Sequence, residues 1–126
     1  MKRILLAAAL LVTASSAFAE WKLVESNNAQ EIYIEPSKLR SDGDTVKHWD
    51  LFSYQKTQIA DGIKYRSRIV RTQTDCKNER FRVLLITLYS EAMGRGSVVR
   101  THNIQTEWQD IVPGTVADNV SRLLCD

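Results

Sequence analysis

Cysteine, proline, histidine and long apolar runs are all scarce in this sequence, and each shortage narrows what the protein can be. Of 126 residues, two are Cys, two are Pro and two are His. His48 and His102 stand in no metal-ligating spacing, so the sequence predicts no metal site and no cofactor. After residue 19 no apolar run approaches the roughly 20 residues that a membrane-spanning helix needs. We therefore expect a chain that does not span a membrane.

Motifs that support catalysis are missing as well. No serine stands in a Gly-x-Ser-x-Gly elbow, and Gly94-Arg95-Gly96-Ser97 precedes a predicted strand instead of the helix N-terminus that binds phosphate. Asp75 and Glu79 flank a turn together with Lys77 and Arg80, which favours salt bridges over acid–base chemistry. Without a nucleophile, a base and an orienting group, the sequence predicts that the protein is not an enzyme.

The N-terminus has the pattern of an export signal. Lys2 and Arg3 precede a nine-residue apolar run, Ile4 to Val12, and Ala17-Phe18-Ala19 matches the site that signal peptidase cuts. The sequence therefore predicts a signal peptide over residues 1–19, a mature chain from Glu20, and a periplasmic or secreted location. No cysteine follows the apolar run, so this chain lacks the lipobox residue that anchors bacterial lipoproteins.

Cleavage would change both the charge and the size of the protein. Two of the 17 Lys and Arg residues lie in the signal, whereas all 15 Asp and Glu residues lie after it, so the mature charges cancel. Residues 20–126 have a length typical of one small domain with a modest core. Export to an oxidising compartment predicts that Cys76 and Cys125, the two cysteines present, form a disulfide. Their spacing excludes a Cys-x-x-Cys redox centre.

Short alternating segments separated by glycine and proline predict strands joined by turns. Val83 to Ile86 is apolar at four consecutive positions, which indicates a central strand covered on both faces. Lys64–Asp75 and Arg80–Tyr89 should pair as a long hairpin, and Ser37–Arg40 should form one helical turn. The other expected strands are Trp21–Glu25, Glu31–Glu35, Val46–Gln55, Val98–Asn103 and a short edge strand at Thr106–Trp108.

The C-terminal segment changes to a helical period. Val116, Val120, Leu123 and Leu124 fall on one helical stripe, and Thr115 can cap the helix with Asp118 three residues later. The fold class predicted is α+β: an antiparallel sheet of about six strands with one C-terminal helix packed on it. The disulfide would tie this helix to the tip of the long hairpin.

The segment from Lys64 to Arg100 contains nine Lys or Arg residues against three acids. One interpretation is that these basic strands pair with acidic neighbours across the sheet. The other is an exposed basic stripe on the hairpin that binds an anionic lipid headgroup, a glycan or an acidic protein surface. Export argues against nucleic acid as the natural ligand. The candidate stripe consists of Arg66, Arg68, Arg80 and Arg82.

Several stretches of the mature chain form a specific combination of motifs. They are Trp21, Tyr33–Pro36, Arg40–Gly43, Val46–Trp49, Tyr65–Ser67, Asp75–Arg80, Tyr89–Gly96, Trp108 and the segment from Pro113 to Cys125. Through these stretches the chain resembles the bacterial surface-adhesin protein E family over nearly its whole mature length. The resemblance implies an antiparallel sheet with a disulfide-tied C-terminal helix, homodimers, and adhesion to host extracellular-matrix proteins.

Two functions remain open from the sequence. The first is an exported, non-enzymatic binding protein of the adhesin E type, which attaches to matrix or other macromolecular partners. The alternative is a structural or regulatory factor of the periplasm, or a protein inhibitor, which needs no display at the cell surface.

Overall fold

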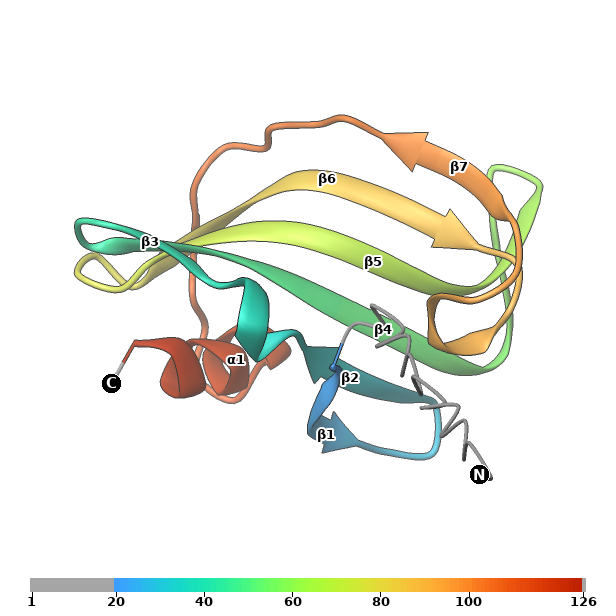
Figure 1. Ribbon diagram of the computed structural model, residues 1–126, viewed down its shortest axis with the longest axis horizontal. Coiled ribbons are helices and arrows are strands. Elements are labelled where there is room, and N and C mark those ends of the chain that lie inside the picture. Colours follow the sequence, from blue (N-terminus) through green and yellow to red (C-terminus); the bar gives the residue numbers. More distant parts are fainter. Residues whose placement is uncertain (1–19, 126) are drawn as a thin grey trace, which may run out of the picture.

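The computed structural model describes residues 20–125, so the expected signal peptide, residues 1–19, lies outside the described residues. A curved antiparallel sheet forms the body of the molecule, and one helix lies against one end of it (Figure 1). Six strands follow one another in the order β1-β2-β4-β5-β6-β7, while the short β3 pairs with β4 and the short β8 with β6. The strands are β1 (Lys22–Ser26), β2 (Gln30–Ile34), β3 (Arg40–Asp42), β4 (Thr45–Ala60), β5 (Ile63–Asp75), β6 (Arg80–Tyr89), β7 (Val98–His102) and β8 (Gln109–Asp110).

The long strands β4, β5 and β6 form the centre of the sheet and agree with the predicted hairpin. Strand β4 is longer than expected because it continues past Gln55 to Ala60, with a break in the pairing register between Ser53 and Gln58. Even-numbered residues of β4 from position 46 to 52 lie opposite even-numbered residues of β5, so they share one face. Odd-numbered residues of both strands share the other face.

Helix α1 (Val116–Leu124) covers the even-numbered face near β1 and β2 (Figure 1). The Thr115 hydroxyl oxygen accepts a hydrogen bond from the Asp118 amide at 3.3 Å, which confirms the predicted cap. Val120 is 2% exposed because it points from the helix into the core. The Asn119 side-chain amide also donates to the Glu25 carboxylate at 3.2 Å, so the helix is fixed to β1 by a polar contact.

The disulfide between Cys76 and Cys125 is present and joins the helix to the tip of the β5–β6 hairpin, as predicted. The Cys76 amide also donates to the Asp44 carbonyl at 2.9 Å, so the β3–β4 turn is held beside the same tip. These contacts make the left end of the molecule in Figure 1 a junction of two hairpin turns and the helix C-terminus.

A short 3-10 helix, η2 (Ala92–Gly94), covers part of the odd-numbered face at the opposite end. The Met93 amide donates to the Ser53 hydroxyl at 3.1 Å, and the Gly94 amide donates to the Ser67 hydroxyl at 2.8 Å. Both serines are buried because η2 lies over them. The 3-10 helix η2 does not cover the remainder of this face, which lies toward the disulfide end.

Three local expectations need correction. The helical turn is a 3-10 helix, η1 (Pro36–Lys38), and is followed by β3. The edge strand lies at Gln109–Asp110, after the predicted Thr106–Trp108. Thr106 contacts β6 at one point only, where its amide donates to the Val83 carbonyl and its hydroxyl accepts from the Val83 amide, both at 2.9 Å. Strand β6 lies between β5 and the β7 and β8 strands, but Val83 to Ile86 is only half-buried, so neither face is fully covered.

Candidate functional site

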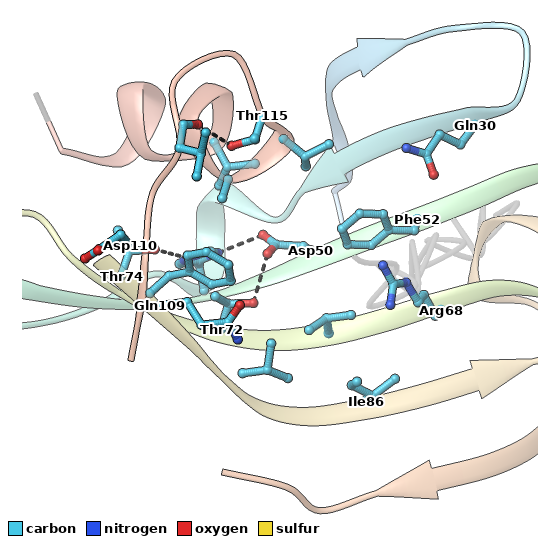
Figure 2. A pocket seen from close by; sticks show the side chains of 18 residues that line it. Gln30, Asp50, Phe52, Arg68, Thr72, Thr74, Ile86, Gln109, Asp110 and Thr115 are labelled. Atoms are coloured by element: carbon cyan, nitrogen blue, oxygen red, sulfur yellow. Dashed lines mark hydrogen bonds and ion pairs between the residues drawn. The ribbon is translucent and has the colours of Figure 1, made fainter. Parts of the chain in front are cut away.

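A cavity of about 510 Å³ lies between the even-numbered face of the sheet and helix α1 (Figure 2). Strands β2, β4, β5 and β6 form its floor, and the segment from β8 to α1 forms its roof. Its volume falls within the range of roughly 300–1,000 Å³ typical of small-molecule sites. The residues lining it are Gln30, His48, Asp50, Phe52, Arg68, Val70, Thr72, Thr74, Phe81, Val83, Ile86, Gln109, Asp110, Val112, Thr115, Val116, Ala117 and Val120.

Four buried polar side chains form a hydrogen-bonded cluster in the cavity floor. His48 Nδ1 lies 2.7 Å from Asp50 Oδ1, and His48 Nε2 lies 2.8 Å from Thr74 Oγ1. The Thr72 hydroxyl donates to Asp50 Oδ2 at 3.0 Å. Because the Asp50 carboxylate only accepts, Nδ1 of His48 donates to it, and the hydrogen bonds form a chain that runs from Thr72 through Asp50 and His48 to Thr74. Each member therefore has a hydrogen-bond partner within the cluster, which stabilises these buried polar groups.

Arg68 contributes a positive charge to the same cavity. Its guanidinium carbon lies 4.3 Å from the centre of the Phe52 ring, and its Nε is buried without a hydrogen-bond partner among residues 20–125. Burial raises the pKa of the neighbouring Tyr54 phenol, whereas the positive charge of Arg68 acts to lower it. Figure 2 shows Arg68 and Gln30 at one end of the cavity and Thr74 and Asp110 at the other.

The opposite face of the sheet carries a second group of arginines, which lie against aromatic rings. The guanidinium carbons of Arg80 and Arg82 lie 4.6 Å and 4.4 Å from the centre of the Trp108 ring. Arg71 lies 5.3 Å from the centre of the Trp49 ring. Cation–π contacts of this kind contribute about 0.5–1 kcal/mol each where the groups are exposed. We call these five residues the tryptophan–arginine surface.

The predicted basic stripe is divided between the two faces, so the expectation of one stripe is wrong. Arg68 points into the cavity, and Arg66 donates to the Tyr54 and Gln55 carbonyls at 3.1 Å and 3.0 Å. Arg80 and Arg82 lie on the other face. The pairing register of β5 and β6 shifts between Arg71 and Thr72, where β6 has one extra residue, Leu84. On the turn side of this bulge, Arg80 and Arg82 lie opposite odd-numbered residues of β5, whereas beyond it even-numbered β6 residues lie opposite even-numbered ones such as Arg68.

The salt bridge expected at the β5–β6 turn is present. Arg80 Nε lies 2.9 Å from Asp75 Oδ2. Hydrogen bonds from the Asn78 side chain and backbone, followed by the Arg80 charge, lower the pKa of the Asp75 carboxyl to about 2. The turn is therefore held by an ionised carboxylate at neutral pH.

Sequence reasoning missed two features of the site. The polar cluster was the first. His48 and Asp50 on β4, and Thr72 and Thr74 on β5, are each spaced by two residues, so within each strand both side chains point to the same face. This spacing is visible in the sequence and could have indicated the cluster. Trp108 was missed because its partners lie 26 residues or more away in the sequence, and only the pairing of β8 with β6 brings them together.

The described part of the chain offers no further obvious chemistry. Within residues 20–125, no three His, Cys, Asp or Glu side chains gather into a group that could hold a metal ion. Over the same residues, no helix combines the length and apolar character needed to cross a membrane.

Several crystal structures of Haemophilus influenzae protein E share this fold. One aligns with a TM-score of 0.65 at 18% identity and covers 86% of this chain and 85% of that chain. Crystal form II gives a TM-score of 0.68 at 18% identity, with 86% and 88% covered. The protein from non-typeable Haemophilus influenzae gives 0.61 at 17% identity, with 88% and 78% covered. No curated protein sequence matches the chain significantly.

A family model extends this likeness from the fold to the sequence itself. The model of surface-adhesin protein E matches residues 21–126, which is most of the chain and includes both the cavity and the tryptophan–arginine surface. The match agrees with the resemblance that the motifs of the mature sequence indicated. This protein therefore belongs to the surface-adhesin protein E family.

Proposed function

We propose that this protein is an exported, non-enzymatic binding protein that attaches to anionic macromolecules of a host matrix, in the first instance sulfated polysaccharides. The carrying observation is the contact of Arg80 and Arg82 with Trp108 on the sheet face opposite the cavity. Membership of the surface-adhesin family supports a binding role. The pairing of flat aromatic rings with guanidinium groups supports the choice of ligand.

The geometry of the two arginines leaves donors available for a ligand. Arg80 uses its Nε to bind Asp75 Oδ2 at 2.9 Å, and Arg82 uses its Nε to bind Gln73 Oε1 at 2.9 Å. An arginine has five N–H donors, and no intramolecular bond of the terminal nitrogens of either residue occurs among residues 20–125. These terminal nitrogens suit the bidentate binding of a sulfate or carboxylate group.

The pairing of the strands extends the surface across the sheet. Lys47 on β4 lies opposite Gln73 on β5, which lies opposite Arg82 on β6. The next odd-numbered residues along the same face, Trp49 and Arg71, form the second cation–π pair. An extended polymer could therefore contact several positive charges in a row, with sugar rings against the tryptophans.

Binding of purified protein to immobilised heparin tests this proposal. We expect the wild-type protein to be retained and released by salt, because exposed charge pairs are screened at high ionic strength. Arg82→Gln and Trp108→Ala should each weaken retention by roughly tenfold, the effect of losing about 1.4 kcal/mol. Lys64→Gln is the matched control because it removes one exposed positive charge at the far end of β5.

Equal loss of retention in Lys64→Gln and Arg82→Gln would contradict the proposal, since it would indicate attraction by overall charge alone. Absence of retention of the wild-type protein at low salt would also contradict it. Unfolding curves of all three variants should remain close to that of the wild type, which separates loss of ligand from loss of fold.

A further inference from the structure

We propose that the cavity between the sheet and helix α1 binds a small amphipathic molecule with one acyl chain and one anionic head group, and that Arg68 binds the head group. This site lies on the face opposite the tryptophan–arginine surface, so evidence against one proposal would not count against the other. The cavity holds about 510 Å³, enough for a small molecule but too little for a folded partner.

The first support is the state of Arg68. Its Nε is buried and lacks a hydrogen-bond partner, and no carboxylate in residues 20–125 forms a salt bridge with it. Leaving a buried charged donor unpaired is costly, and a ligand carboxylate or phosphate would supply the missing acceptor. The Phe52 ring holds the guanidinium group from one side, which fixes its direction at the cavity end.

The second support is the apolar character of the rest of the cavity. Val70, Val83 and Ile86 of the sheet face Val116 and Val120 of the helix across it. An acyl chain laid along these side chains would remove apolar surface from water on both molecules, which contributes roughly 25 cal/mol per Å².

The polar cluster in the floor explains why the head group belongs at Arg68 and not elsewhere. Both oxygens of Asp50 already accept hydrogen bonds, from His48 and from Thr72. An anion placed beside this cluster would face the Asp50 carboxylate, and Asp110 lines the same cavity. Figure 2 shows Arg68 at the opposite end from Asp110, the same end as the uncharged Gln30. Charge therefore gives the ligand one orientation.

Titration of the protein with decanoate, decyl phosphate and 1-decanol tests the proposal. Calorimetry measures affinity, and ¹H–¹⁵N NMR spectra locate the site. We expect decanoate or decyl phosphate to shift the amide signals of Val70, Ile86 and Val120, and 1-decanol to bind at least tenfold more weakly. Tighter binding of decanoate would identify a free fatty acid as the class of ligand, and tighter binding of decyl phosphate a lipid-derived phosphate; either supports the proposal.

Two variants and a control make the test specific. Arg68→Met keeps the length of the side chain but removes its charge, and should weaken decanoate and decyl phosphate roughly tenfold to a hundredfold without weakening 1-decanol. Ile86→Trp should fill the cavity and abolish binding of all three probes. Arg66→Met is the matched control, because Arg66 lies two residues away on the same strand and does not line the cavity.

The proposal is overturned if neither anion binds, if 1-decanol binds as tightly as decanoate, or if Arg68→Met binds the anions as well as Arg66→Met does. Among residues 20–125 Arg68 forms no salt bridge, and Met can keep the packing of the side-chain stem against Phe52, so the variant should fold; circular dichroism checks this. The wild-type NMR titration decides the location even if Ile86→Trp fails to fold.

Discussion

The guanidinium carbon of Arg82 lies 4.4 Å from the centre of the Trp108 ring, although 26 positions separate the two residues in the sequence. The contact depends on β8, whose Gln109 and Asp110 pair with Phe81 and Arg80 of β6. A two-residue strand therefore brings the tryptophan to the arginines. The same backbone pairing places Gln109 on the cavity side, so this one segment contributes to both faces of the sheet.

The disulfide should contribute strongly to stability. Replacing Cys76 and Cys125 together by Ser removes a link across a sequence separation of 49. In the chain-entropy model, a loop of this size stabilises the fold by about 4 kcal/mol. Urea unfolding of the double variant should show that loss, measured against the oxidised wild type. An unchanged midpoint would mean that the helix is held by its other contacts alone.

The turn beside the disulfide should make stability depend on acid pH. Asp75 has its pKa lowered from 3.8 to about 2, chiefly by hydrogen bonds from Asn78. A carboxyl group whose pKa is lower in the folded state stabilises the fold above its unfolded pKa, and this contribution disappears as pH falls toward 2. Asp75→Asn should flatten that part of the stability curve.

Asp61→Asn is the control for this pH dependence. Asp61 has a side chain that is 87% exposed and lies 3.5 Å from Arg100. Exposed pairs of this kind contribute little. The slope between pH 4 and pH 2 should therefore remain in Asp61→Asn, and a slope that also remains in Asp75→Asn would contradict the assignment.

Replacing the buried His48 should lower the free energy of unfolding more than replacing the half-buried His102. His48→Ala leaves the Asp50 carboxylate buried with Thr72 as its remaining partner, and removing a hydrogen-bond partner from a buried acceptor costs about 1–3 kcal/mol, or more where the acceptor is charged. His102 lies at the end of β7 and is half-buried, so His102→Ala should cost much less. Chemical denaturation of the two variants compares them directly, and equal losses would refute the role of the cluster.

Two glycines separate the effect of backbone conformation from the effect of packing. A Cβ at Gly94 would lie 3.0 Å from Ile69 Cδ1, whereas a Cβ at Gly43 would meet nothing within 4 Å. Both have positive φ, +69° and +60°, so Ala is strained at either position by roughly 1–2 kcal/mol. Thermal unfolding should show a larger loss for Gly94→Ala than for Gly43→Ala. Equal losses would mean that η2 moves freely to accommodate the methyl group.

The sequence predicted elements well where periodicity and local chemistry decide the outcome. Strands β5 and β6, the Thr115 cap and the Cys76–Cys125 bond all follow from alternation, side-chain chemistry or counting. The face of Arg82 relative to Arg68 depends on one bulge between the paired strands, which leaves no distinct mark in the sequence. A shift of one residue in the β5–β6 pairing therefore places Arg68 and Arg82 on different faces, where the sequence predicted a single basic stripe.

The cavity was harder to predict than the sheet because it is a property of the space between elements. Val83 and Ile86 were recognised as apolar, but their partners Val116 and Val120 come from a helix far along the chain. The sequence predicts which residues form the apolar stripe of that helix, but it does not predict how far the helix lies from the sheet. Arg68 then appeared as one basic residue among nine, although in the fold it is the arginine that lines the cavity.

Attachment of cells to a heparin-coated surface tests the central claim most directly. Cells that produce the full chain should react with antibody while intact and should attach to the coating. Cells producing the Arg82→Gln, Trp108→Ala double variant should display equal amounts of protein but attach much less, whereas Lys64→Gln should attach as the wild type does. If intact cells fail to bind antibody and the protein is found only in the periplasm, or if the double variant attaches normally, the account of an adhesin acting through the tryptophan–arginine surface is contradicted.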